Sequence, residues 1–129
     1  MSNQSYIQVT FPIIGYHQWP DAPDLRAYLR NSHRHRFIIT TAIEVFEEDR
    51  EIEFHDFLAF CQQSIPHRET HIESEPINFG AMSCEAIARG LAEKVNLKYN
   101  HSGIPGEKRD ISIAVSEDGE ASAMFTMKF

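Results

Sequence analysis

The sequence is poor in cysteine and has no long apolar run. Its two cysteines, Cys61 and Cys84, both fall in segments with helical apolar spacing, so we expect buried thiols in a reducing cytosol rather than a disulfide scaffold. No apolar run approaches the roughly 20 residues that span a bilayer. The first residues, MSNQSYIQVTF, lack the basic start and apolar stretch of a secretory signal. These absences predict a cytoplasmic protein with no membrane partner.

Positive charge is also scarce. Twelve lysines and arginines stand against 19 aspartates and glutamates, which gives a net charge of -7. A nucleic-acid partner is disfavoured, because binding to phosphates requires a basic surface. What the chain does contain is 42% hydrophobic residues in 129 positions, enough for one domain with a buried core. No linker, repeat or low-complexity block divides residues 1–129, so a single domain is expected.

The apolar pattern predicts an α+β domain. Alternation and β-branched residues indicate four strands, over residues 6–14, 36–46, 110–116 and 120–129. Helical spacing predicts one helix over residues 54–64 and a second that begins after the N-cap Ser83, while residues 24–31 fit a short helix or a loop. The order β-β-α-α-β-β places two helices on one face of an antiparallel sheet. Such a small open sheet has two unpaired edges, which favours a homo-oligomer.

Three histidines fall where the first two strands would meet. His33 and His35 stand at the start of the second strand, and residues two apart on a strand point to the same face. His17 lies just past the first strand, and a β-hairpin would bring it to the same end of the sheet. Three imidazoles around one zinc ion leave a fourth position for water or substrate, as in catalytic zinc sites.

Two other interpretations of the histidines compete with this one. The chain has seven histidines, so a His-x-His pair can arise without a metal. His67 and His71 are spaced for one helix face, but Pro66 and the loop-like residues around them argue against a helix there. Their segment, HRETH, also differs from the zinc motif HExxH in the place of its glutamate.

Five stretches, in order, resemble the motifs of one family. GYHQW and HRHRF are similar to its metal-binding pieces, and REIEFHDF and MSCEAIA to the starts of its two helices. ISIAVSEDGEASAMF is similar to its closing pair of strands. The family is that of the pyruvoyl-tetrahydropterin and carboxytetrahydropterin synthases, which have the tunnelling fold (T-fold). The resemblance covers nearly the whole chain and is weakest between His17 and His33.

The resemblance implies a set of functional residues. His17, His33 and His35 would bind zinc, and Glu117 would hold the ligand. A carboxylate suits that role, because it accepts two parallel hydrogen bonds from the N–H and amine of a pterin or guanine-like ring. Ser83, at the entry to the second helix, is a further candidate for substrate binding. Family members form trimers that close a barrel, so a trimer or hexamer with sites between subunits is expected.

The chain also departs from the family pattern. The family uses a cysteine shortly before the His-x-His motif, but QWPDAPDLRAYLRNS contains none. The family's Asp-His pair falls on Glu69 and Thr70, with His71 one position late, so Glu69 and His71 are the candidate catalytic residues. Arg34 replaces the glycine between the two metal-binding histidines.

Three functions follow from these observations. The leading hypothesis is a zinc-dependent lyase that acts on a pterin such as dihydroneopterin triphosphate, in a reaction of the type found in queuosine biosynthesis. Its triphosphate would need cations, for which the candidates are Arg34, Arg36, Lys108 and Arg109. The alternative is a non-catalytic protein that binds a pterin, deazapurine or nucleotide and has lost the cysteine. A third possibility is an oligomeric interaction module.

Overall fold

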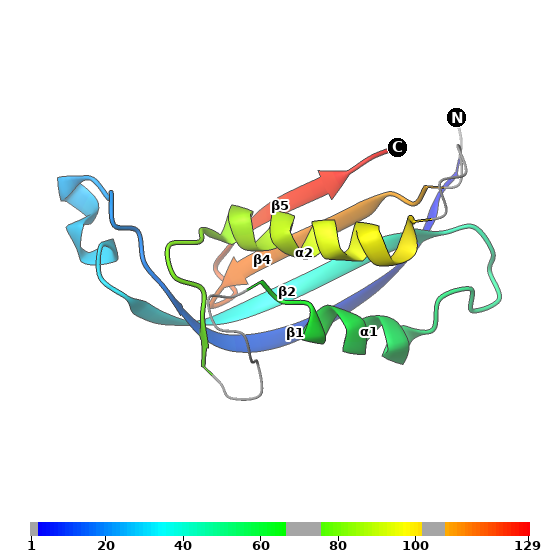
Figure 1. Ribbon diagram of the computed structural model, residues 1–129, viewed down its shortest axis with the longest axis horizontal. Helices are drawn as coiled ribbons and strands as arrows, with labels where there is room; N and C mark the ends of the chain where they lie inside the picture. Colours follow the sequence, from blue (N-terminus) through cyan, green and yellow to red (C-terminus); the bar gives the residue numbers. More distant parts are fainter. Residues whose placement is uncertain (1–2, 67–75, 102–107) are drawn as a thin grey trace.

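A five-stranded sheet carries two helices on one face in the computed structural model, which describes residues 3–66, 76–101 and 108–129 (Figure 1). The strands are β1 Ser5–His17, β2 His33–Val45, β3 Ile77–Asn78, β4 Ile111–Glu117 and β5 Ala121–Met127. The helices are η1 Asp24–Leu29, which is a 3-10 helix, α1 Phe54–Gln63 and α2 Cys84–Tyr99. The predicted α+β arrangement is confirmed. Within the described ranges, no helix combines the length and apolarity needed to cross a bilayer.

The strands lie in the order β3-β1-β2-β4-β5. β1 pairs with β2, β2 with β4 and β4 with β5, and all three pairs are antiparallel. The sequence predicted four strands, and β3 is the additional one. It pairs in parallel with Gly15 and Tyr16 at the end of β1. A strand of two residues is too short to show alternation, which is why the sequence pattern assigned it to a loop.

Alternate residues of the three central strands form the core beneath the helices. The buried residues of these rows are Val9, Phe11, Ile13, Phe37, Ile39, Ile43, Ile111, Ile113 and Val115. α1 adds Phe57 and Cys61, and α2 adds Ile87, Leu91 and Val95. The opposite face of the sheet carries hydroxyl groups, including a cross-strand Thr10–Thr40 contact of 3.2 Å. The helix-facing side of the sheet is therefore apolar, and the other side carries hydroxyl groups. The helix-facing rows of side chains continue to the ends of their strands.

A glycine allows the chain to cross the end of β1. A Cβ at Gly15 would lie 2.6 Å from Cε2 of the fully buried Phe79 ring and 3.1 Å from the Ile77 carbonyl oxygen. With glycine there, the Phe79 N–H donates to the Tyr16 carbonyl at 2.8 Å, and the Gln18 N–H donates to the Gly80 carbonyl at 2.8 Å. The segment that precedes α2 is thereby held against the last residues of β1.

The predicted start of the second helix is confirmed. The Ser83 hydroxyl accepts a hydrogen bond from the Ala86 N–H at 3.1 Å, which is the N-cap interaction that satisfies an otherwise unpaired donor. The end of β1, the start of β2, the end of β4 and the start of α2 all meet at one end of the molecule (Figure 1).

Candidate functional site

Strand alternation carries four polar side chains to the end of the helix-facing rows. His17 is the last residue of β1 and pairs directly with His33, the first residue of β2. His35 follows two positions later on the same face, and Glu117 ends β4 opposite Phe37. The expected hairpin geometry is confirmed, with β2 beginning early enough to place both of its histidines in the strand.

The three histidines converge. Their candidate ligand nitrogens all lie within 4.8 Å of one another. The ring centroids of His17 and His33 are 4.5 Å apart, those of His33 and His35 are 4.9 Å apart, and those of His17 and His35 are 5.4 Å apart. The structure thus brings together the three residues that the sequence singled out, in an arrangement compatible with a metal site.

Each imidazole is oriented through its Nδ1 atom by an oxygen acceptor. The three contacts are His17 to the Met82 carbonyl at 3.0 Å, His33 to the Asn31 carbonyl at 2.9 Å, and His35 to Asp118 Oδ2 at 2.7 Å. A carbonyl or carboxylate oxygen cannot donate, so Nδ1 must carry the proton in all three rings. In a neutral ring the lone pair then lies on Nε2, which is the tautomer that metal-binding histidines adopt when their other nitrogen is hydrogen-bonded.

The surroundings of the Nε2 atoms fit a cation. His35 Nε2 is buried and has no hydrogen-bond partner among the described residues, and its distance to Glu117 Oε2 is 3.7 Å. His17 Nε2 lies 3.0 Å from Glu117 Oε1. Burial lowers the pKa of His17, which favours the neutral ring. A neutral ring with its proton on Nδ1 opposes one acceptor to another at that contact, and a cation bound at Nε2 would remove this repulsion.

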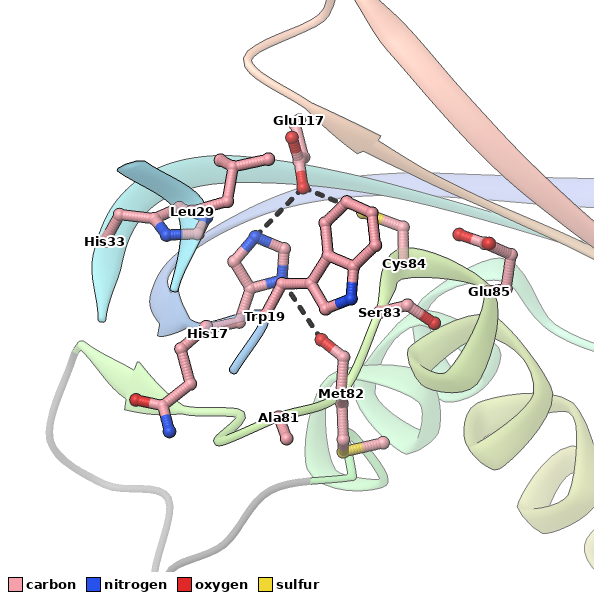
Figure 2. A pocket seen from close by; sticks show the side chains of 11 residues that line it. His17, Trp19, Leu29, His33, Ala81, Met82, Ser83, Cys84, Glu85 and Glu117 are labelled. Carbon is pink, nitrogen blue, oxygen red and sulfur yellow. Dashed lines mark hydrogen bonds and ion pairs between the residues drawn. The ribbon is translucent and has the colours of Figure 1, made fainter. Parts of the chain in front are cut away.

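A pocket of about 310 Å³ adjoins the histidines (Figure 2). Its lining residues are His17, Gln18, Trp19, Leu29, His33, Ala81, Met82, Ser83, Cys84, Glu85 and Glu117. Both predicted substrate-binding residues, Glu117 and Ser83, therefore border it. Ser83 uses its hydroxyl in the helix cap, whereas the Glu117 carboxylate faces the pocket and is 37% exposed.

Cys84 is part of the pocket wall. The sequence indicated a packing role in the helix, and Cys84 does pack against the core. Its Sγ also lies 3.4 Å from Glu117 Oε1, to which the thiol can donate (Figure 2). Burial, reinforced by the neighbouring Glu117 carboxylate, raises the pKa of the Cys84 thiol to about 12. Cys84 therefore remains a neutral thiol near pH 7.

Trp19 and Leu29 form the wall that sequence reasoning missed. They belong to the segment between His17 and His33 where the family resemblance is weakest. The main-chain N–H of Trp19 donates to the Leu29 carbonyl at 2.7 Å. Trp19 is the only tryptophan of the chain and is 48% exposed. The one signal in the sequence is that this single tryptophan stands two positions after the candidate ligand His17.

None of the four predicted phosphate-binding cations lines the pocket. Arg109 lies at the other end of the sheet, where its Nη1 donates to Glu51 Oε1 at 2.7 Å and its guanidinium stacks 4.8 Å from the Phe46 ring centroid. Lys108 lies over the Phe129 ring. Alternation along β2 turns Arg34 and Arg36 to the face opposite the histidines. None of the four therefore reaches this pocket within one chain, and their role as phosphate ligands stays a prediction.

The predicted catalytic residues Glu69 and His71 lie outside the described residues.

In sequence comparisons, no family model matches the chain, and no curated protein matches it either. Solved structures do match. An uncharacterized protein from Wolinella succinogenes aligns over 98% of this chain and 100% of its own, with a TM-score of 0.66 and 14% identity.

Two enzymes also align over almost their whole length. The 6-pyruvoyl tetrahydropterin synthase of Plasmodium falciparum covers 99% of this chain and 100% of its own, with a TM-score of 0.65 and 12% identity. The Caenorhabditis elegans enzyme of the same name covers 98% of this chain and 97% of its own, with a TM-score of 0.58 and 10% identity. The chain has the T-fold of these synthases. The match extends over every element that carries the histidine cluster and the pocket, so the whole site is built on the T-fold.

Proposed function

We propose that this chain is a zinc-dependent T-fold enzyme that acts on a pterin or a related purine-derived compound, with a carbon–oxygen lyase reaction of the carboxytetrahydropterin synthase type and a role in queuosine biosynthesis. The observation that carries the proposal is the convergence of one ring nitrogen from each of three histidines beside a small pocket. Solved structures of 6-pyruvoyl tetrahydropterin synthases with the same fold support the substrate class.

His17, His33 and His35 would hold the metal. Zinc suits three neutral imidazoles and, when bound, polarises substrate oxygens and lowers the pKa of a coordinated water. The protein contributes the orientation of the rings, through the Met82 and Asn31 carbonyls and the Asp118 carboxylate. Burial of His17 contributes further, because it favours the neutral form that a metal requires.

Glu117 would anchor the ring of the ligand. Its carboxylate faces the pocket and offers two oxygens to a ring N–H and an adjacent amine, a pairing that is strong and geometrically selective. The volume of about 310 Å³ is near the lower end of the range for small-molecule sites, about 300–1,000 Å³, and suits a bicyclic ring. The lining has two glutamates and, among the described residues, no lysine or arginine. We therefore expect recognition of the ring rather than of a phosphate group by these residues.

Proton transfer would fall to Glu69 and His71. Cys84 borders the pocket, but a thiol whose pKa is raised to about 12 holds its proton and does not replace the family's reactive cysteine. Carboxylic acids and imidazoles in general have pKa values closer to neutral pH than such a thiol, which is what general acid–base catalysis requires.

We further propose that the sites lie between subunits of a homo-oligomer, either a trimer or a hexamer. β5 pairs only with β4, and β3 covers only Gly15 and Tyr16 of β1, so both edges of the sheet have unpaired stretches in the described structure. A second hollow, lined by Cys84, Glu85, Glu117 and residues 121–123, extends from the site to the β5 edge. Light scattering coupled to size-exclusion chromatography tests this: a monomer would contradict it.

The decisive experiment combines zinc analysis with turnover. The purified protein, loaded with one equivalent of zinc, is incubated with dihydroneopterin triphosphate, and the products are separated by liquid chromatography. We expect substrate consumption that is lost, together with the zinc, in the variant His33→Ala/His35→Ala. Glu117→Gln should retain zinc and lose ligand affinity, because an amide offers one acceptor where the carboxylate offers two. Ligand binding without turnover would identify the non-catalytic alternative, and a protein that takes up neither zinc nor ligand would refute the proposal.

A further inference from the structure

Asp118 occupies a constrained position in the turn between β4 and β5. Asp118 and Gly119 have φ values of 57° and 79°, and the Glu120 N–H donates to the Glu117 carbonyl at 3.1 Å. Positive φ at both central residues is the requirement of a type I′ turn, for which Asp-Gly is a preferred sequence. The turn type therefore explains the backbone conformation of Asp118 without any reference to the metal site.

The Asp118 side chain, by contrast, forms hydrogen bonds with β2. Its Oδ2 lies 2.7 Å from His35 Nδ1, and its Oδ1 accepts a hydrogen bond from the Arg36 N–H at 3.0 Å. The Asp118 N–H donates in turn to the Arg36 carbonyl at 2.8 Å. Three interactions with two consecutive residues leave the carboxylate little freedom, so it defines the direction of the His35 ring.

We infer that Asp118 is the positioning residue that holds His35 in the metal-binding tautomer and thereby sets the affinity of the metal centre. The inference rests on the metal centre of the proposed function. With Nδ1–H donated to the carboxylate, the buried Nε2 atom of the neutral ring keeps its lone pair for a metal, in a cluster whose candidate ligand atoms lie within 4.8 Å of one another. An ionised acceptor also raises the basicity of the ring it orients, which a neutral acceptor does less strongly.

The other two histidines lack an equivalent side-chain partner among their described contacts. His17 and His33 donate to the main-chain carbonyls of Met82 and Asn31, which no substitution removes. Without Asp118, His35 has an alternative tautomer in which Nε2–H points toward Glu117 Oε2, now 3.7 Å away. That tautomer would close the Nε2 position to a metal. Asp118 is thus the one residue in this set whose removal can change the tautomer of a ligand.

Two variants test the inference without straining the turn. Asp118→Asn removes the charge and retains an amide oxygen, and asparagine tolerates positive φ. Asp118→Gly removes the side chain at a backbone conformation that glycine adopts freely. The matched control is Glu120→Gln, which removes one negative charge from the same turn and leaves the Glu120 backbone hydrogen bond intact.

Zinc affinity is measured by competition with a chromophoric chelator in the full-length protein. Loss of an outer-shell partner typically weakens metal binding about 10–100-fold. We expect a loss near the upper limit for Asp118→Gly, a smaller loss for Asp118→Asn, and an affinity within about twofold of the wild-type value for Glu120→Gln, because its carboxylate is not in contact with a ligand.

The tautomer itself is read by ¹⁵N NMR of the histidine rings in the metal-free protein. We expect a protonated Nδ1 and an unprotonated Nε2 for His35 in the wild type, and a shift toward the opposite tautomer in both Asp118 variants. Should Asp118→Gly fail to fold, the zinc affinity and the ¹⁵N spectrum of Asp118→Asn test the inference instead. Wild-type zinc affinity and an unchanged His35 tautomer in the Asp118 variants would overturn the inference alone. A wild-type protein that binds no zinc would overturn the proposed metal centre as well.

Discussion

Substitution of Gly15 by alanine should weaken the fold and the proposed metal site together. Gly15 has no positive φ, so the backbone itself accepts alanine. The obstacle is space: the new Cβ would lie 2.6 Å from Cε2 and 3.0 Å from Cδ2 of Phe79, whose ring is fully buried. Either the ring moves or β3 separates from β1, and both responses disturb the segment that ends at the Met82 carbonyl.

The size of the effect follows from two opposing contributions. Overpacking of a close-packed core costs about 1–3 kcal/mol. The reduced freedom of the unfolded chain when glycine is replaced returns about 0.4–1 kcal/mol. The free energy of unfolding should therefore fall by roughly 1–2 kcal/mol, which for a chain of this size corresponds to a decrease of several degrees in Tm. Zinc affinity should fall as well, because the Met82 carbonyl that orients His17 lies three residues beyond Phe79.

Thermal unfolding by circular dichroism and chelator competition for zinc measure the two effects. Ile43→Val is the matched control: Ile43 is fully buried on the same face at the far end of the sheet, and its substitution costs about 0.5–1.5 kcal/mol. This control should lose stability while keeping its zinc affinity. A Gly15→Ala protein with wild-type Tm and wild-type zinc affinity would show that Phe79 yields without cost, and the reasoning would be refuted.

Three further predictions concern other parts of the molecule. The hydrogen bond from Arg109 lowers the pKa of Glu51, so this pair stabilises the fold above about pH 4.5 and loses its effect as the pH falls through the lowered pKa. Between pH 6 and pH 3, urea unfolding should therefore show a smaller stability loss for Glu51→Gln than for the wild type. Burial raises the pKa of both Cys61 and Cys84 to about 12, so iodoacetamide should alkylate the folded protein at pH 8 far more slowly than the urea-unfolded chain, and equal rates would contradict these environments. Trp19 lies in the pocket wall, so a pterin that binds there should quench the fluorescence of this single tryptophan. Quenching that is unchanged in Glu117→Gln at the same ligand concentration would show that the ligand binds elsewhere.

The fold was largely predictable because its elements follow regular patterns. Alternation over residues 110–116 and 120–129 and the helical spacing after Ser83 identified elements whose observed ends differ by a few residues. β3 was missed because it consists of Ile77 and Asn78 alone, and its pairing depends on the glycine opposite it rather than on any local pattern. Such a contact between distant segments has no signature in the sequence of either one.

The site was predictable only in part, for a related reason. The spacing of His33 and His35 and the position of His17 identified the cluster, because these properties depend on strand periodicity. The position of three other side chains beside the site, those of Asp118, Trp19 and Cys84, depends on how turns and helix ends approach one another in space. The distance of Arg109 from the pocket has the same origin: Arg109 precedes β4 and Glu117 ends it, so the strand separates the two residues.

The register of β1 against β2 connects the core to the chemistry of the site. Because side chains alternate, a slip of one residue in this pairing would turn one strand over relative to its partner and separate His17 from His33. The same slip would expose the apolar row formed by Val9, Phe11 and Ile13 and remove it from the helices. At about 25 cal/mol per Å² of apolar surface, the burial of these three side chains alone opposes the slip by several kcal/mol. The core therefore enforces the convergence of the imidazoles, so a metal bound in the proposed site would find its ligands already in place.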